Sequence, residues 1–171
     1  MLEITSTPLV IMAILGTVGI LLPIISIVRK EKGSNSFYAV IAFAALIVSM
    51  GYVGYQFLNE NVAPAALFSE DVIVDDAFGG LFAIAMLIVA LFTTVGSFNY
   101  MRKHNSPAVY YSLILLATIG MVLVAYSTDL VMLFVAWELM SIPTYVLVGF
   151  MKKNPSSNEA ALKYFLFGAL S

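Results

Sequence analysis

Residues 130–151 read LVMLFVAWELMSIPTYVLVGFM, and this stretch decides what kind of protein the chain forms. It matches the ~20 apolar residues that a helix needs to cross a bilayer, and Glu138 is its only charged residue. An ionised carboxylate near the bilayer centre costs about 3 kcal/mol or more. The side chain must therefore be paired, protonated or in contact with a wet cavity. Each of these states makes Glu138 a candidate for ion or proton handling.

The composition of the whole chain agrees with a membrane protein. Its 171 residues are 61% hydrophobic and only 11% charged, whereas a soluble domain has about 25% charged residues. The chain has no Cys, which excludes disulfides, thiolate zinc sites and cysteine-ligated iron–sulfur clusters. Basic residues are not interleaved with aromatic ones, so we expect no nucleic-acid partner. The expected fold class is an all-α polytopic membrane protein in contact with the lipid bilayer.

The hydrophobic pattern predicts the helices. A sixth apolar segment begins near Asn158, behind the N-cap candidates Ser156 and Ser157, and is still apolar at Ser171. We therefore expect five complete transmembrane helices, part of a sixth, and a chain that is the N-terminal part of a longer protein. Residues 1–106 would hold helices one to three with an acidic external loop at 59–76, and residues 107–171 the next two and the start of another. The five predicted spans are 8–28, 37–58, 77–98, 107–126 and 130–151.

Charges alternate between successive loops. The loops 29–36, 99–106 and 152–157 hold seven of the eight basic residues, whereas 59–76 and 127–129 hold only acidic charges. The positive-inside rule makes the basic loops cytoplasmic and places the N-terminus outside the cell membrane. The β-branched stretch 68–76 predicts a short external strand or hairpin.

Glu138 shares a helix face with other polar groups. Ser141 and Tyr145 follow at i+3 and i+7, and Pro143 cannot donate to the carbonyl of Leu139. A carboxylate whose protonation follows the position of a nearby cation is the physical basis of a proton switch. The alternative is a protonated structural Glu138, hydrogen-bonded within a helix bundle.

Lys163 is the second candidate for proton transfer, about five residues into the sixth segment. Two structural alternatives compete with this role: Glu159 stands at i−4 in the favourable order for a salt bridge, and the ammonium can snorkel to the interface. Glu138 should lie ~12 Å deeper than Lys163. We therefore expect no direct salt bridge between them.

Three further residues receive structural interpretations. Asp129, at the start of its helix, is expected to be an N-cap rather than a proton carrier. His104 is expected to be a solvated loop residue, because a lone His is a poor metal site. Trp137 is expected to pack beside the carboxyl group of Glu138.

Two stretches resemble a known family. Residues 133–150, LFVAWELMSIPTYVLVGF, resemble the fifth transmembrane helix of the antiporter-like subunits of respiratory complex I, and residues 159–171, EAALKYFLFGALS, resemble the start of the sixth. The second stretch is most similar to subunit N, a family that includes the subunit of an archaeal deazaflavin-linked dehydrogenase. The specific resemblance covers about the last 45 residues, and the first 125 fit only in topology.

The resemblance implies a fourteen-helix fold with two inverted repeats of five helices, with Glu138 and Lys163 at the family's proton-transfer positions. It also implies a non-redox, proton-translocating subunit of an NADH or reduced-deazaflavin:quinone oxidoreductase. This chain would bind no cofactor itself. NAD(H) or deazaflavin, flavin, iron–sulfur clusters and quinone would belong to other subunits, and the partners would be other antiporter-like and small membrane subunits. The family's helix-seven lysine lies beyond Ser171, so we expect the isolated 171-residue chain to be inactive.

Two other readings stay open. One is a subunit of an Mrp-type cation/proton antiporter or an antiporter-like subunit of a membrane-bound hydrogenase. The other is a purely structural membrane subunit with an inert Glu138.

Overall fold

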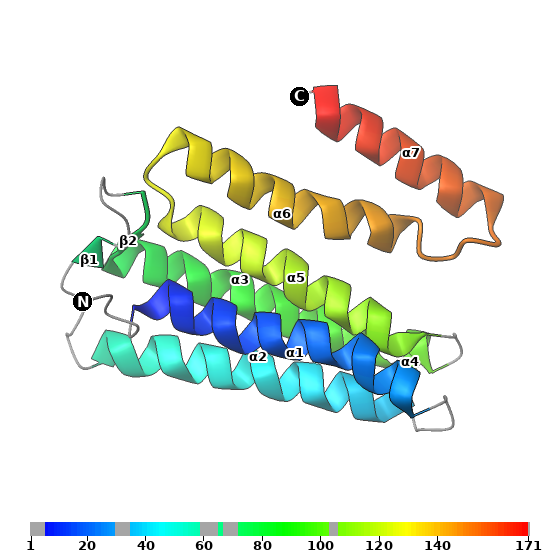
Figure 1. Ribbon diagram of the computed structural model, residues 1–171, viewed down its shortest axis with the longest axis horizontal. Coiled ribbons are helices and arrows are strands. Elements are labelled where there is room, and N and C mark those ends of the chain that lie inside the picture. Colours follow the sequence, from blue (N-terminus) through cyan, green and yellow to red (C-terminus); the bar gives the residue numbers. More distant parts are fainter. Residues whose placement is uncertain (1–5, 30–34, 59–64, 67–71, 103–105, 171) are drawn as a thin grey trace.

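The chain folds into an up-and-down bundle of long helices (Figure 1). The computed structural model describes residues 6–29, 35–58, 65–66, 72–102 and 106–170. Within these ranges five helices are long and apolar enough to cross a membrane, which confirms the all-α membrane fold. The helices are α1 (Thr7–Val28), α2 (Asn35–Leu58), α3 (Ala77–Gly96), α4 (Phe98–Met101), α5 (Pro107–Tyr126), α6 (Leu130–Val148) and α7 (Pro155–Leu170).

The predicted helix boundaries need three corrections. The third span ends at Gly96, and the short helix α4 follows Ser97, whose hydroxyl donates to the carbonyl of Thr93. Helix α6 ends at Val148, three residues earlier than predicted. The Ser156 and Ser157 cap prediction is wrong: α7 begins at Pro155, and the side-chain oxygen of Asn154 accepts from the backbone N–H of Ser156 at 3.1 Å.

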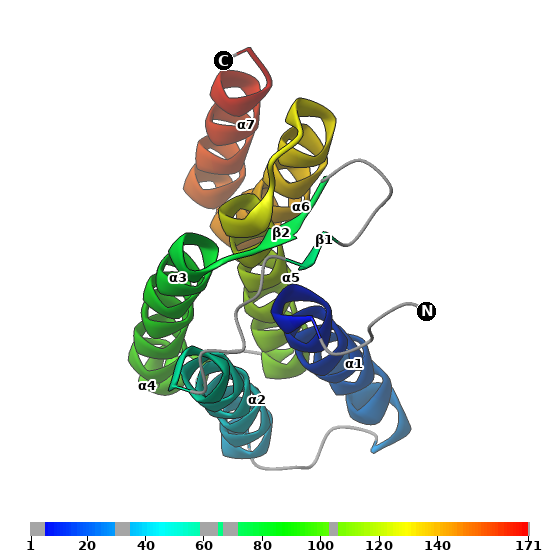
Figure 2. The ribbon, with the colours of Figure 1, turned by 90° about the vertical axis from the view of Figure 1, so that its left-hand side faces the viewer.

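Helix α5 occupies the centre of the bundle. In the end-on view of Figure 2 it lies among the other helices. It contacts α1, α2, α3 and α6, and most of its side chains are buried. The hydroxyl of Ser112 on α5 donates to the carbonyl of Gly19 on α1, and Thr118 donates to the carbonyl of Ile114 within its own helix. The buried hydroxyl groups of Ser112 and Thr118 therefore find backbone acceptors, as a low-dielectric interior requires.

Small residues allow two close helix contacts. Ala39, Ala42 and Ala45 are all buried on α2, as expected for residues that let helices approach closely. Gly120 is the tightest point between α5 and α6: a Cβ atom there would lie 2.7 Å from the Cα of Met140 and 2.9 Å from the carbonyl oxygen of Ala136. No side chain fits at Gly120 unless the two helices move apart.

A small hairpin lies at the end of the bundle that holds the first helix's N-terminus. Strand β1 (Ala65–Ala66) pairs antiparallel with β2 (Val74–Asp75). The predicted strand within 68–76 is confirmed for β2, whereas β1 lies before that stretch. Asp75 accepts from the backbone N–H of Thr7 at 2.6 Å, and Asp76 accepts from that of Gly79 at 2.7 Å. Two consecutive carboxylates thus cap two helices, α1 and α3.

Apart from Glu138, Glu159 and Lys163, the described charges separate to the two ends of the bundle. The C-terminal ends of α1, α4 and α6 lie at one end, and the two strands and the N-terminal ends of α1 and α6 lie at the other (Figure 1). The described basic residues at the first end are Arg29, Arg102, Lys152 and Lys153, and the carboxylates at the other are Asp75, Asp76 and Asp129. Lys30, Lys32, Lys103, His104, Glu60, Glu70 and Asp71 lie outside the described residues, so their predicted loop roles stay predictions.

Candidate functional site

Glu138 lies near the middle of α6. It is eight residues from Leu130 and ten from Val148, so ~12 Å and ~15 Å from the two ends of the helix. Ala136, two residues earlier, is fully buried against α5, whereas Glu138 itself is half-buried. Since two residues correspond to about 200° of helical rotation, the carboxylate lies on the face turned away from α5.

Glu138 has no ion-pair or hydrogen-bond partner among the residues that the structure describes. No group of three or more His, Cys, Asp or Glu that could hold a metal ion occurs in this part of the chain. The carboxylate therefore stands on an incompletely covered helix face, midway along an apolar span.

The polar stripe formed on α6 by Glu138, Ser141 and Tyr145 leads toward α7. Ser141 is buried, and the Tyr145 ring packs edge-on against Tyr164 at 5.0 Å and Phe165 at 5.5 Å between ring centroids. Helix α6 continues through Pro143, which is buried. The tyrosine is thus held by α7 and continues the stripe from Glu138 to the α6–α7 interface.

Lys163 forms the salt bridge that its sequence position predicts. Its Nζ lies 2.6 Å from Oε1 of Glu159, and both side chains are 65% exposed. Among the described residues no ion pair joins Lys163 to Glu138. The contact of Tyr145 with Tyr164 places Lys163, the residue before Tyr164, near the level of Tyr145. Glu138 lies seven residues before Tyr145, so it is ~10 Å away from that level along α6. The proton-transfer role of both residues stays a prediction.

The remaining interpretations have different outcomes. Asp129 is confirmed as an N-cap, because its carboxylate accepts from the backbone N–H groups of Val131 at 2.8 Å and Met132 at 3.1 Å. Trp137 is 50% exposed. Half of the side chain is therefore uncovered by the described residues, and its packing beside the carboxyl group of Glu138 stays a prediction.

Sequence reasoning missed two features. Lys152 and Lys153 served only as topology markers, yet both line a pocket at the basic end of the bundle. The hydroxyl groups of Ser6, Ser49 and Tyr126 are buried without a hydrogen-bond partner in the described part of the chain. The lysine pair followed by Asn-Pro was a visible signal for the first feature, whereas burial of a hydroxyl depends on neighbouring helices and leaves no local signal.

Comparison with known proteins places these features in a family. The family described as NADH:quinone oxidoreductase/Mrp antiporter, TM, matches residues 127–171, which include Glu138 and Lys163. The fold is similar to a chain of respiratory complex I from Thermus thermophilus with bound aureothin, with a TM-score of 0.73 and 26% identity over 94% of this chain and 33% of that chain. The protein is therefore a multi-pass helical membrane protein of the antiporter-like class.

Sequence relatives narrow the class to one subunit type. NADH-quinone oxidoreductase subunit N 1 of Koribacter versatilis is 38% identical over 157 residues, covering 90% of this chain and 31% of the relative. F(420)H(2) dehydrogenase subunit N of Methanosarcina mazei is 36% identical over 128 residues, covering 75% of this chain and 26% of the relative. The chain belongs to the subunit N family of antiporter-like membrane subunits.

The extent of the match corrects one expectation. The chain spans about a third of the length of the curated relatives it matches. Within the chain, however, the similarity reaches well beyond the last 45 residues, because the alignment with the Koribacter versatilis protein covers 90% of it. The early helices therefore share sequence as well as topology with the family.

Proposed function

We propose that this chain is part of a proton-translocating membrane subunit of a redox-driven oxidoreductase complex, and that Glu138 carries a proton within it. The observation that carries the proposal is the position of Glu138: a lone carboxylate midway along an apolar span, on a helix face that the described bundle leaves partly open. A group so placed is stable in the membrane only when protonated, hydrated or paired. Its charge state therefore responds to any cation or water that reaches that face.

Lys163 is proposed as the second proton-transfer group. It lies on α7, the helix that contacts Tyr145, and its ammonium is paired with Glu159. An exposed pair of this kind is weak, at about 0–1 kcal/mol, so it can exchange with other partners. Movement of the ammonium between Glu159 and water on the Glu138 side would link the two residues over the ~10 Å that separates their levels.

The redox chemistry is assigned to other subunits. The chain contains no Cys to hold an iron–sulfur cluster. Because relatives named for NADH-quinone and for F(420)H(2) oxidation are both similar to this chain, the proposed electron donor is NADH or a reduced deazaflavin. The proposed partners are the other membrane subunits of the complex, and the proposed orientation places the N-terminus outside and the basic end of the bundle in the cytoplasm.

The test is Glu138→Gln in the complete complex, with proton translocation measured in vesicles alongside electron transfer. Glutamine keeps the size and polarity of the side chain but cannot ionise. We expect proton translocation per electron pair to fall at least tenfold. Asp129→Asn is the matched control, since it removes a carboxylate from the same helix and keeps a good N-cap, and it should leave translocation unchanged. Unchanged translocation in Glu138→Gln would mean that Glu138 is structural.

The same family description supports a second candidate, a cation/proton antiporter. Vesicles made with and without Na⁺ distinguish the two. Translocation driven by electron transfer in the absence of Na⁺ supports the first function, and proton movement driven only by a Na⁺ gradient supports the second.

A further inference from the structure

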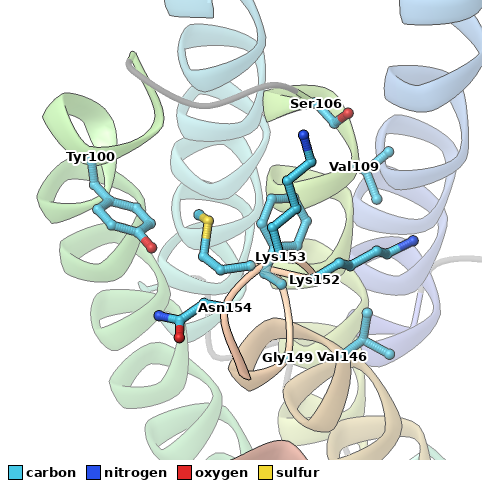
Figure 3. Close-up of a pocket in the computed structure, with 10 residues that line it drawn as sticks. Tyr100, Ser106, Val109, Val146, Gly149, Lys152, Lys153 and Asn154 are labelled. Carbon is cyan, nitrogen blue, oxygen red and sulfur yellow. The ribbon is translucent and has the colours of Figure 1, made fainter. Parts of the chain in front are cut away.

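A pocket of about 780 Å³ opens at the basic end of the bundle (Figure 3). One wall comes from α4 and the start of α5, and the other from the end of α6 and the turn that leads to α7. In Figure 3 the two lysines lie between Tyr100 on one side and Val109 on the other. The lining residues are Tyr100, Ser106, Val109, Val146, Gly149, Phe150, Met151, Lys152, Lys153 and Asn154.

The charge of the pocket has one sign. Lys152 and Lys153 are exposed, line the pocket, and form no ion pair with any residue that the structure describes. No Asp or Glu is among the lining residues. Glu159 on the first turns of α7 is already paired with Lys163. The pocket therefore presents two positive charges to a ligand, with hydroxyl and amide groups nearby to donate hydrogen bonds.

Four other lining residues are apolar, and one of them, Phe150, is held by an aromatic contact. Val109 on α5 and Val146 on α6 line the pocket together with Phe150 and Met151. Phe150 packs edge-on against Tyr110 at 5.3 Å between ring centroids, and the Tyr110 hydroxyl lies 2.9 Å from that of Ser97. The ligand should accordingly combine an anionic group with an apolar part.

The pocket lies at the level where a membrane changes from apolar to polar. Its residues flank the end of the α6 span at Val148 and the start of the α5 span at Pro107. Lipid phosphates occupy this level, with acyl chains directed along the helices below, and basic pockets between transmembrane helices bind anionic headgroups. A volume of this size also fits a headgroup with the first part of an acyl chain.

We propose that the pocket binds an anionic phospholipid, with the phosphodiester between Lys152 and Lys153 and an acyl chain along Val109 and Val146. The bound lipid would join the start of α5 to the α6–α7 turn, and so support the base of the two helices that carry Glu138 and Lys163.

The test measures lipid binding to the full-length protein purified from its membrane, by native mass spectrometry with dioleoyl phosphatidylglycerol and dioleoyl phosphatidylcholine. Lys152→Gln and Lys153→Gln should each weaken phosphatidylglycerol binding about fivefold, from the attraction of one basic residue for an anionic surface. Phosphatidylcholine binding should change less than twofold. Arg29→Gln is the matched control: it removes one charge from the same end of the bundle, beside Phe37 and away from the pocket, and should change neither.

A second variant tests the apolar wall. Val146→Trp fills the pocket and keeps both lysines, so phosphatidylglycerol binding should fall by at least fivefold. Equal losses in Arg29→Gln and the lysine variants would overturn the proposal, because they would show general attraction to a basic surface. Competition by inorganic phosphate, combined with no effect of Val146→Trp, would also overturn it, because the pocket would then be a site for free anions.

Discussion

Helices α5 and α6 are similarly apolar neighbours, but the bundle treats them differently. In α5, 61% of the span is buried inside the protein, against 17% in α6. Helix α5 is surrounded by α1, α2, α3 and α6, whereas α6 contacts α5 on one side and α7 on another. The carboxylate of Glu138 is on the less covered helix. The carboxylate proposed to carry a proton thus lies on the helix that the described residues cover less.

The two helices also satisfy their polar groups differently. Ser112 and Thr118 on α5 donate to backbone carbonyls, while Glu138 on α6 has no partner among the described residues. Hydroxyl groups can be satisfied inside a bundle by the backbone, whereas a carboxylate needs a proton, a cation or water. The comparison predicts that gaining a carboxylate on α5 lowers the free energy of unfolding, whereas losing the carboxylate on α6 does not.

The largest effect is expected from a carboxylate on α5. Leu115 is fully buried against α1 near Gly19, so Leu115→Glu would bury an unpartnered charge and should lower the free energy of unfolding by about 3 kcal/mol or more. Thermal or denaturant unfolding in detergent measures the change. Leu115→Gln separates charge from shape and should cost less. Wild-type stability in Leu115→Glu would mean that water reaches α5. The two helices would then not differ in how they tolerate a carboxylate.

A smaller loss is expected at the contact between the two helices. Gly120→Ala places a Cβ atom 2.7 Å from the Cα of Met140, where the backbone cannot yield, and should cost about 1–3 kcal/mol. Gly51→Ala is the matched control, since nothing lies within 4 Å of its new Cβ and alanine favours helix by about 1 kcal/mol. Equal stability of the two variants in detergent would show that α5 and α6 are not tightly packed at Gly120.

The hairpin cap should contribute less. Asp75→Ala removes the acceptor for the N–H of Thr7 and should cost about 1–2 kcal/mol. Faster hydrogen exchange should be confined to the first turn of α1. Asp75→Asn retains an oxygen acceptor and should lose less, and unchanged exchange in Asp75→Ala would show that the hairpin does not hold α1.

The smallest effect is expected from loss of the carboxylate on α6. Glu138→Leu should leave the unfolding free energy within about 1 kcal/mol of the starting value, with any change stabilising, because it removes a half-buried charge that has no described partner. The same unfolding assay measures it, beside Leu115→Glu. A loss of 2–3 kcal/mol would mean that Glu138 holds the bundle together.

Local sequence was sufficient for the spans, for the Asp129 cap and for the Glu159–Lys163 pair. Apolar runs predicted the five spans to within three residues, since spanning length depends on composition alone. Asp129 as an N-cap and the Glu159–Lys163 pair at i,i+4 were predictable because both involve residues within one helical turn. The solitary charge at Glu138 was visible for the same reason.

Tertiary structure decided which helix is central and which groups meet. The burial of α5, the close approach at Gly120, the cap on Thr7 by Asp75, and the pocket at Lys152 and Lys153 all join residues distant in the chain. Sequence alone does not distinguish a lipid-facing leucine from one that faces another helix, because lipid tails and protein interiors are equally apolar. The sequence by itself determined that the chain crosses a membrane with one carboxylate in its fifth span. Only helix packing decided that this carboxylate is half-buried among the described residues, because exposure depends on neighbours that hydropathy does not specify.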